Sequence, residues 1–133
     1  MLRAVALIKQ LPWLHPATLR LSGFIQSEPW GYDSDNPFLN VGLAVDITDG
    51  TSPLDILDDL QTIQDKISPA SHRDSSGNYI DRIIDIDIIA IDEITFNHPR
   101  LIIPHPRMHL RDFVLQPMKQ LAPHWRHPLI DSI

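Results

Sequence analysis

The clearest hydrophobic pattern in this chain is a strict alternation over Phe38–Thr48. Every second position there carries a branched aliphatic residue, in the order Leu39, Val41, Leu43, Val45 and Ile47. Residues two apart share one face of a strand. The pattern therefore predicts one continuous strand with a buried face, and it places Phe38 and Asn40 together on the other face.

Two segments instead repeat apolar residues at helical spacing. Over Pro53–Ile67 the apolar positions fall three or four apart, and Ser52 offers an N-cap in front of Pro53. This predicts an amphipathic helix. A shorter helix is predicted over Leu2–Leu11, because Pro12 would end it.

The remaining segments complete an alternating order of helices and strands. We predict strands over Thr18–Ser27 and Ile83–Ile91, loops over Glu28–Pro37, Ser68–Asn78 and Pro99–Pro106, and a helix over Leu110–Leu121. Helices packed on one face of an antiparallel sheet suit this order. The predicted fold class is therefore α+β, in one domain over residues 1–133.

Composition narrows the function. The chain has 133 residues, a formal net charge of −6 and no cysteine. Without a basic stripe it is not expected to bind nucleic acid. The apolar start Met1–Leu14 contains Arg3 and Lys9 and is too short to span a membrane, so we expect a cytoplasmic protein. An acidic protein that binds phosphates needs local arginines, divalent cations or both.

The most informative chemistry lies in the predicted strand Ile83–Ile91. Asp85 and Asp87 would share a face, with Cα atoms about 6.5–7 Å apart, in an otherwise isoleucine-rich segment. Two adjacent carboxylates repel each other, and a bound cation would relieve that repulsion. Oxygen ligands favour Mg²⁺. The same spacing also suits an exposed strand face with two solvated aspartates, and the pattern alone leaves both interpretations open.

Several motifs together resemble the 6-hydroxymethyl-7,8-dihydropterin pyrophosphokinases. They are Glu28-Pro29-Trp30-Gly31 followed by Phe38-Leu39-Asn40, then Asp81-Arg82-Ile83-Ile84-Asp85-Ile86-Asp87-Ile88, Pro99-Arg100-Leu101-Ile102-Ile103-Pro104-His105-Pro106, and Arg111-Asp112-Phe113-Val114-Leu115-Gln116-Pro117. The resemblance runs from Ala4 to about Pro128. It implies a ferredoxin-like antiparallel sheet and diphosphate transfer from ATP to the hydroxymethyl group of the pterin, giving AMP.

The resemblance also implies roles for individual residues. Asp85 and Asp87 would hold two Mg²⁺ ions, with Arg82 beside them as a catalytic residue. The ATP site would comprise Gln61, Arg73, Arg82, Ile88, Arg100, His105 and Arg111. The pterin pocket would comprise Ser27, Trp30, Phe38, Asn40, Tyr79 and Phe113.

Each of these residues also has a simpler interpretation. Phe38 and Phe113 would serve equally well as core residues, and Arg100 and Arg111 as solvated surface charges. His105, between two prolines, would serve as a turn cap. The other histidines, among them His98, His109, His124 and His127, form no convincing zinc pattern, and we expect them on the surface.

The chain also departs from the family pattern. It begins at the first helix, so the strand that would be central in the sheet is missing. The missing strand would be explained by a start codon assigned too late in the gene or by a truncation. It would also be explained if another segment fills its place, such as a strand donated by a second chain in a dimer. Otherwise we expect a monomer. Ser68–Arg73 lacks the glycine and paired arginines usual in a loop over ATP, and Gln64 replaces a usual acid. The alternative is therefore an enzyme with reduced turnover, or a non-catalytic binding protein of the same fold.

Overall fold

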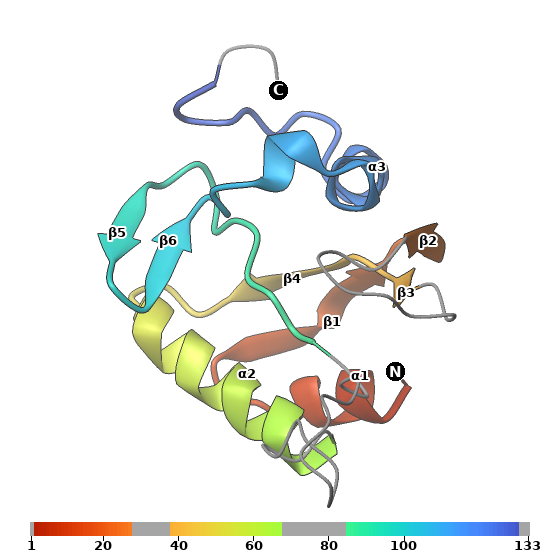
Figure 1. Ribbon diagram of the computed structural model, residues 1–133. Helices are drawn as coiled ribbons and strands as arrows, with labels where there is room; N and C mark the ends of the chain where they lie inside the picture. The colour runs from red at the N-terminus through yellow and green to blue at the C-terminus, as the bar shows by residue number, and fades with distance from the viewer. Residues whose placement is uncertain (1, 28–37, 68–84, 131–133) are drawn as a thin grey trace, which may run out of the picture. The chain divides into compact units, whose positions relative to one another are not determined.

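The computed structural model describes residues 2–27, 38–67 and 85–130 (Figure 1). Its elements in chain order are α1 (Leu2–Ile8), β1 (Leu14–Leu21), β2 (Ile25–Ser27), β3 (Phe38–Asn40), β4 (Leu43–Ile47), α2 (Pro53–Ile67), β5 (Phe96–His98), β6 (Leu101–Ile103), the 3-10 helix η1 (Met108–Leu110) and α3 (Asp112–Leu121). The mixture of helices and strands agrees with the α+β prediction, and the described strands form two-stranded sheets. A single antiparallel sheet stays a prediction.

The chain forms two compact units. One comprises Met1–Pro16 and Asp46–Asp87, and the other comprises Ala17–Val45 and Ile88–Ile133. We call them the first and second units. Strands β1 and β4 pair with each other, and each strand runs through both units. The expectation of a single domain over residues 1–133 stays a prediction.

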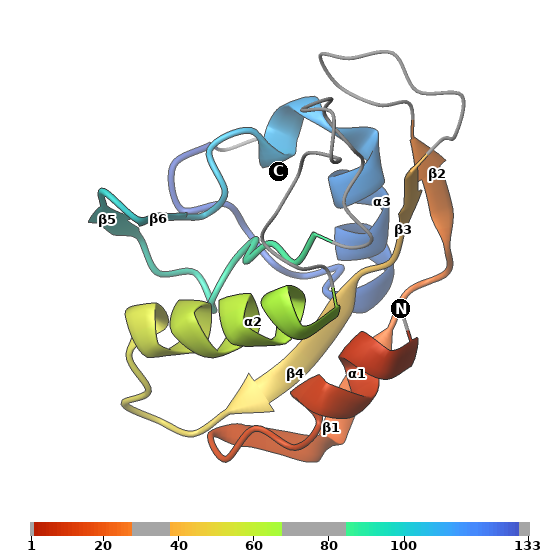
Figure 2. The ribbon, with the colours of Figure 1, turned by 60° about the horizontal axis from the view of Figure 1, so that its bottom comes forward.

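The first unit is built on the packing of α1 against α2 (Figure 2). Its buried side chains include Ala4 and Ile8 of α1 and Ile56, Leu57 and Ile63 of α2. The indole Nε1 of Trp13 donates a hydrogen bond to Asp59 of α2 over 2.8 Å. The helix predicted over Pro53–Ile67 is confirmed at both ends, and that over Leu2–Leu11 ends earlier, at Ile8.

The second unit combines two antiparallel hairpins with α3. Strand β2 pairs with β3, and β5 pairs with β6. Figures 1 and 2 both show α3 beside the β2–β3 hairpin. The buried side chains of this unit come from β6, η1 and α3, namely Ile103, Met108, Val114 and Leu121. The helix predicted over Leu110–Leu121 is confirmed for most of its length.

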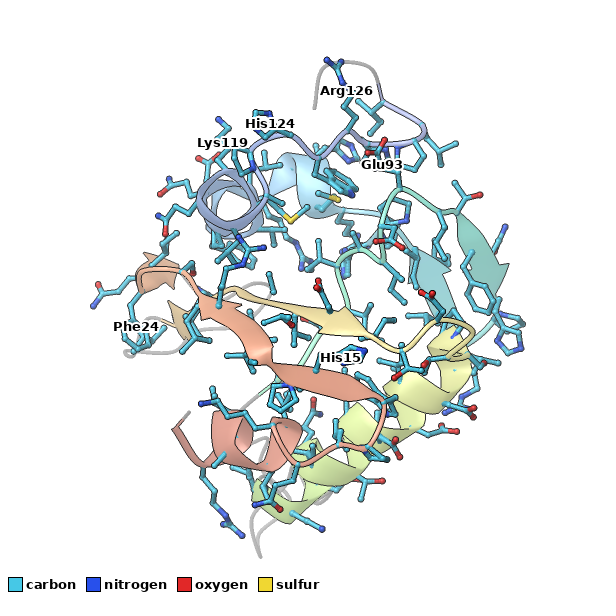
Figure 3. The ribbon with its side chains drawn as sticks, turned by 180° about the vertical axis from the view of Figure 1, so that it is seen from behind. His15, Phe24, Glu93, Lys119, His124 and Arg126 are labelled. Atoms are coloured by element: carbon cyan, nitrogen blue, oxygen red, sulfur yellow. The ribbon has the colours of Figure 1, made fainter. Side chains whose placement is uncertain are left out.

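The continuous strand predicted over Phe38–Thr48 is wrong. The ladder stops at Asn40 and resumes at Leu43, because the backbone N–H of Gly42 donates instead to the Ser22 hydroxyl. The break also exposes Leu39, which the alternation assigned to the buried face and which is 51% exposed. Phe24, 61% exposed, projects from the link between β1 and β2 (Figure 3).

Two further strand predictions need correction. The strand predicted over Thr18–Ser27 is two strands, since the chain leaves the extended ladder at Ser22–Phe24 and β1 begins earlier, at Leu14. The loop predicted over Pro99–Pro106 contains β6, whose register with β5 pairs Phe96 with Ile103. Pro16 lies inside β1, and a proline normally argues against a strand, so local patterning did not find this start.

The strand predicted over Ile83–Ile91 is wrong for the described residues 85–91, which belong to no strand. The backbone N–H of Ile86 donates to the side chain of Gln64, and the carbonyl of Ile89 accepts from His105. The isoleucine-rich segment therefore has hydrogen-bond partners outside a sheet. In the part of the chain that is described, no helix is long and apolar enough to cross a membrane.

Candidate active site

The β2–β3 hairpin brings three of the predicted pterin-binding residues onto one short ladder. Its register pairs Ile25 with Asn40 and Ser27 with Phe38. Residues 28–37, which join these strands in the sequence, lie outside the described residues. Local patterns do not reveal this pairing, because each strand has only three residues. Ser27, Phe38 and Asn40 therefore lie close together in the fold.

Asn40 is fixed by a hydrogen bond across this hairpin. Its Nδ2 donates to the carbonyl oxygen of Ile25 over 3.1 Å, and the side chain is half-buried. An amide held in this way keeps one orientation, and it presents both donor and acceptor chemistry. A planar heterocycle with mixed donors and acceptors on its edge suits such a group.

The start of α3 carries a cation next to an aromatic ring. The Cζ of Arg111 lies 5.6 Å from the centroid of the Phe113 ring, and both side chains are half-buried. This is the distance of a cation–π contact. Phe113 is therefore half-buried beside a cation, and Arg111 is not fully solvated. The roles of both residues in a binding site stay predictions.

His105 lies in the loop that follows β6, where the backbone fixes both the residue and its ring. Its N–H donates to the Ile89 carbonyl over 2.8 Å, and its Nδ1 accepts the N–H of Arg107 over 3.2 Å. A neutral ring that accepts at Nδ1 carries its proton on Nε2. His105 thus caps a turn, as the simpler interpretation held, and also presents a donor at Nε2.

Two other predicted ATP-site residues belong to the same unit. Arg100 is exposed in the turn between β5 and β6, where its N–H donates to Nδ1 of His98 over 3.1 Å. Ile88 is half-buried. The second unit therefore contains Ile88, Arg100, His105 and Arg111 from the ATP set, and Asn40 and Phe113 from the pterin set.

The acidic pair lies in the first unit. Asp85 and Asp87 are both exposed, whereas Ile86 between them and Ile88 after them are half-buried. The alternation predicted from the sequence is thus present, although the segment belongs to no strand. Oε1 of Gln64 accepts the Ile86 N–H over 2.8 Å. One side chain of α2 therefore holds the backbone between the two carboxylates.

Gln64 is the residue beside the acidic pair that the sequence does not single out. The sequence marks it only as a substitution for an acid, and it is Gln61 that the resemblance places in the nucleotide site. Gln61 lies one turn earlier on α2 and is exposed. The available signal is that Gln61 and Gln64 are two amides three residues apart on an amphipathic helix. Only the structure showed which backbone group it serves.

The donor chemistry of the acidic pair fits magnesium. In the described ranges no group of three or more histidine, cysteine, aspartate or glutamate side chains could hold a metal ion by itself. Magnesium usually takes one or two carboxylates and completes its shell with waters and substrate phosphates. Two exposed carboxylates on one segment fit that requirement, whereas a structural zinc site would need four protein ligands.

Four predicted residues lie outside the described residues, namely Trp30, Arg73, Tyr79 and Arg82. The side chains of Ser27 and Phe38 are also outside the description, although their backbone pairing is given. Their roles stay predictions. Among the histidines expected on the surface, His109 and His124 are exposed, while His98 and His127 are half-buried.

Comparison with known proteins decides the family. A model of the 7,8-dihydro-6-hydroxymethylpterin-pyrophosphokinase family matches residues 1–123. The chain belongs to this pyrophosphokinase family. The resemblance inferred from the motifs is confirmed, and so is the enzyme class, an ATP-dependent pyrophosphokinase.

Individual relatives of this pyrophosphokinase agree. A 2-amino-4-hydroxy-6-hydroxymethyldihydropteridine pyrophosphokinase of Porphyromonas gingivalis is 40% identical over 111 residues, which are 83% of this chain and 73% of the relative. The Bacillus subtilis enzyme of the same name is 31% identical over 122 residues, 90% of this chain and 67% of the relative. That of Haemophilus influenzae is 32% identical over 119 residues, 90% and 69% of the two chains.

Proposed function

We propose that this chain transfers diphosphate from ATP to the hydroxymethyl group of 6-hydroxymethyl-7,8-dihydropterin. The observation that carries the proposal is the family match over residues 1–123 in a chain that keeps both exposed aspartates of the acidic pair. In the reaction, the hydroxyl oxygen of the pterin attacks the β-phosphorus of ATP. A new O–P bond forms, the bond from the β-phosphorus to the α,β-bridging oxygen breaks, and AMP leaves as the hydroxyl proton is released.

The pterin would bind at the β2–β3 hairpin and the start of α3. Asn40, held by Ile25, would hydrogen-bond to the edge of the ring, together with the backbone near Ser27. Phe113 would stack on one face, and Phe38, Trp30 and Tyr79 would complete the pocket. A flat heteroaromatic ligand binds best between apolar faces with a few fixed polar groups.

ATP would be held mainly through its phosphates. Arg100, His105 and Arg111 would contact them, helped by Arg73 and Arg82, while Gln61 and Ile88 would line the nucleotide. Phosphoryl transfer needs positioning and charge neutralisation more than covalent help from the protein. These cationic side chains would supply the local positive charge that a chain of net charge −6 needs in order to bind a polyanion.

Asp85 and Asp87 would hold two Mg²⁺ ions. When bound, magnesium neutralises phosphate charge and orients both reacting groups. The role of the chain would be to keep the two carboxylates exposed, and the hydrogen bond that the Ile86 N–H donates to Gln64 would serve this by fixing the segment. The requirement for magnesium would therefore depend on these aspartates more than on any other side chain.

The ferredoxin-like arrangement is part of the proposal. The pairing of β1 with β4 and the packing of α1 against α2 support it. We also propose that the protein acts as a monomer on its two small-molecule substrates. Sedimentation velocity with and without ATP and magnesium tests this, and a dimer at assay concentration would contradict it.

The decisive experiment replaces each acid by its amide. Asp85→Asn and Asp87→Asn should each lower the rate of AMP formation by about 10²–10³-fold, the usual loss when one electrostatic group of a transition state is removed. Because both side chains are exposed, the melting temperature should not change. Asp65→Asn, at an exposed position of α2, is the matched control and should keep full turnover. Full turnover in both acidic-pair variants would refute the proposed site.

A further inference from the structure

Ser22 makes two hydrogen bonds to Gly42, which lies in the break between β3 and β4. The Ser22 hydroxyl accepts the Gly42 N–H over 2.7 Å, and the Ser22 N–H donates to the Gly42 carbonyl over 2.9 Å. The same hydroxyl donates to the carbonyl of Gly23 over 2.9 Å. Gly42 is thus fixed on both of its backbone polar groups, two residues after Asn40.

Helix α3 approaches Gly42 so closely that only glycine fits. A Cβ atom added to Gly42 would lie 2.6 Å from Cβ of Pro117, 3.1 Å from Cδ1 of Leu121 and 3.3 Å from the Ser22 hydroxyl. The first contact joins two atoms that cannot rotate away, since the Pro117 Cβ is fixed to the helix backbone. Any side chain here would have to move α3 or the β3–β4 link.

The end of α3 has two more attachments to the same region. Oε1 of Gln120 accepts the Gly23 N–H over 2.9 Å, and Nη1 of Arg20 donates to the Leu121 carbonyl over 2.9 Å. A cation at the C-terminus of a helix also interacts favourably with the helix dipole. The C-terminal half of α3 is therefore held in one place.

The residues that touch Gly42 lie on the same side of the helix as Phe113. Residues four apart on a helix are neighbours on one face. Phe113, Pro117 and Leu121 are spaced by four, so they form one row, and Phe113 lies one turn beyond the contact with Gly42. Both residues belong to α3, so a shift of Pro117 would move the turn of the helix that contains Phe113.

We propose that Ser22, Gly42 and Pro117 form a positioning clamp that sets Phe113 relative to Asn40, and thereby sets the affinity for the pterin. The inference rests on the proposed function, in which Asn40 binds the ring edge and Phe113 its face. None of the three clamp residues touches the ligand. Their effect should appear in pterin binding and leave nucleotide binding nearly unchanged.

The two glycines provide a matched pair of variants. Gly42→Ala introduces the short contact with Pro117, whereas an added Cβ at Gly23 would lie 3.8 Å from its nearest neighbour, Oε1 of Gln120, an ordinary contact. Calorimetric titration with a pterin substrate, in the presence of magnesium and a non-hydrolysable ATP analogue, should show at least about tenfold weaker binding for Gly42→Ala. Gly23→Ala should bind like the parent chain, and the ATP analogue alone should bind all three proteins within about twofold.

A second pair keeps the test decisive if Gly42→Ala does not fold. Ser22→Ala removes the hydroxyl that accepts the Gly42 N–H and should also weaken pterin binding, while Ser22→Thr keeps a hydroxyl and should restore it. A merely structural role would lower the melting temperature and impair both ligands alike. Parent-like pterin affinity in the folded clamp variants would overturn the clamp. No pterin binding by the parent chain would overturn the proposed function itself, and the clamp's role with it.

Discussion

The two aspartates and the pterin-binding elements are held in different ways. A ladder joins β2 to β3, and helix α3 is attached to the neighbouring segments through Gly42, Arg20 and Gln120. The segment with Asp85 and Asp87 belongs to no strand, and the Ile86 N–H donates to a single side chain, that of Gln64. The pterin-binding elements are therefore held by contacts from several elements, whereas the hydrogen bond to Gln64 ties the acidic segment to α2.

The difference suits the two tasks. A pterin pocket recognises one rigid ligand, so its groups gain from being fixed before binding. In the proposed function the acidic pair would accept ions together with the phosphates that complete their shells, and a segment outside any strand adjusts to them more easily. The comparison also identifies which substitutions should harm stability, and which should harm turnover alone.

The largest expected effect tests how firmly the second unit supports the loop of His105. Ile103 is 1% exposed at the end of β6, whereas its neighbour Ile102 is 45% exposed. Ile103→Ala should lower the free energy of unfolding by about 2–5 kcal/mol, because it leaves a cavity in the core. Ile102→Ala should cost far less. Urea denaturation of both variants measures the difference, and equal losses would contradict it.

The next effect tests the attachment of the acidic segment. Gln64→Met keeps the length of the side chain but removes the acceptor of the Ile86 N–H. The free energy of unfolding should fall by about 1–3 kcal/mol, and turnover should fall while pterin binding stays unchanged.

Gln64→Glu is the matched control for this attachment, because a carboxylate still accepts the N–H. It should recover the stability lost in Gln64→Met. Steady-state kinetics and denaturation of both variants decide the point, and turnover in Gln64→Met equal to that of the parent would show that the acidic segment is held in some other way.

A smaller effect tests whether turnover depends on the stability of α2 as a whole or on Gln64 alone. Trp13→Phe removes the hydrogen bond to Asp59 and keeps the aromatic ring. The free energy of unfolding should fall by about 0.5–1.5 kcal/mol, with turnover at low temperature unchanged. Denaturation and an AMP assay on the same sample test this. A large loss of turnover here would mean that any loosening of α2 disturbs the aspartates.

The smallest effect concerns pH and the second unit. Burial lowers the pKa of His127 below its usual value, and the nearby charge of His109 lowers it further. The unfolded chain therefore takes up the proton first as the pH falls. Stability from this group is complete above the usual pKa of histidine, about 6.5, and is lost as the pH falls through the lowered pKa.

Nδ1 of His127 accepts the N–H groups of Leu129 and Ile130, which a proton on that nitrogen would prevent. His127→Gln should flatten the decline of melting temperature between neutral and acidic pH, and turnover at neutral pH should not change. Calorimetric melting at several pH values measures the slope. An unchanged slope would show that other groups cause the decline.

Local patterns predicted a substantial part of this protein. The helix α2 was found at both ends, because an N-cap, a proline and an amphipathic repeat all lie within its own residues. The exposure of Asp85 and Asp87 around Ile86 also followed from alternation. The order of short motifs along the chain was enough to identify the family.

The sequence by itself thus determined the extent of α2 and the exposed side on which Asp85 and Asp87 lie. The metal-binding role of these two acids stays a proposal. Only the tertiary structure decided that the strand breaks at Gly42 and that Gln64 serves the Ile86 N–H. The physical reason is that periodicity reports which side of a segment is buried, whereas a backbone hydrogen bond needs a particular partner. At both places that partner is a polar side chain about 20 residues away along the chain.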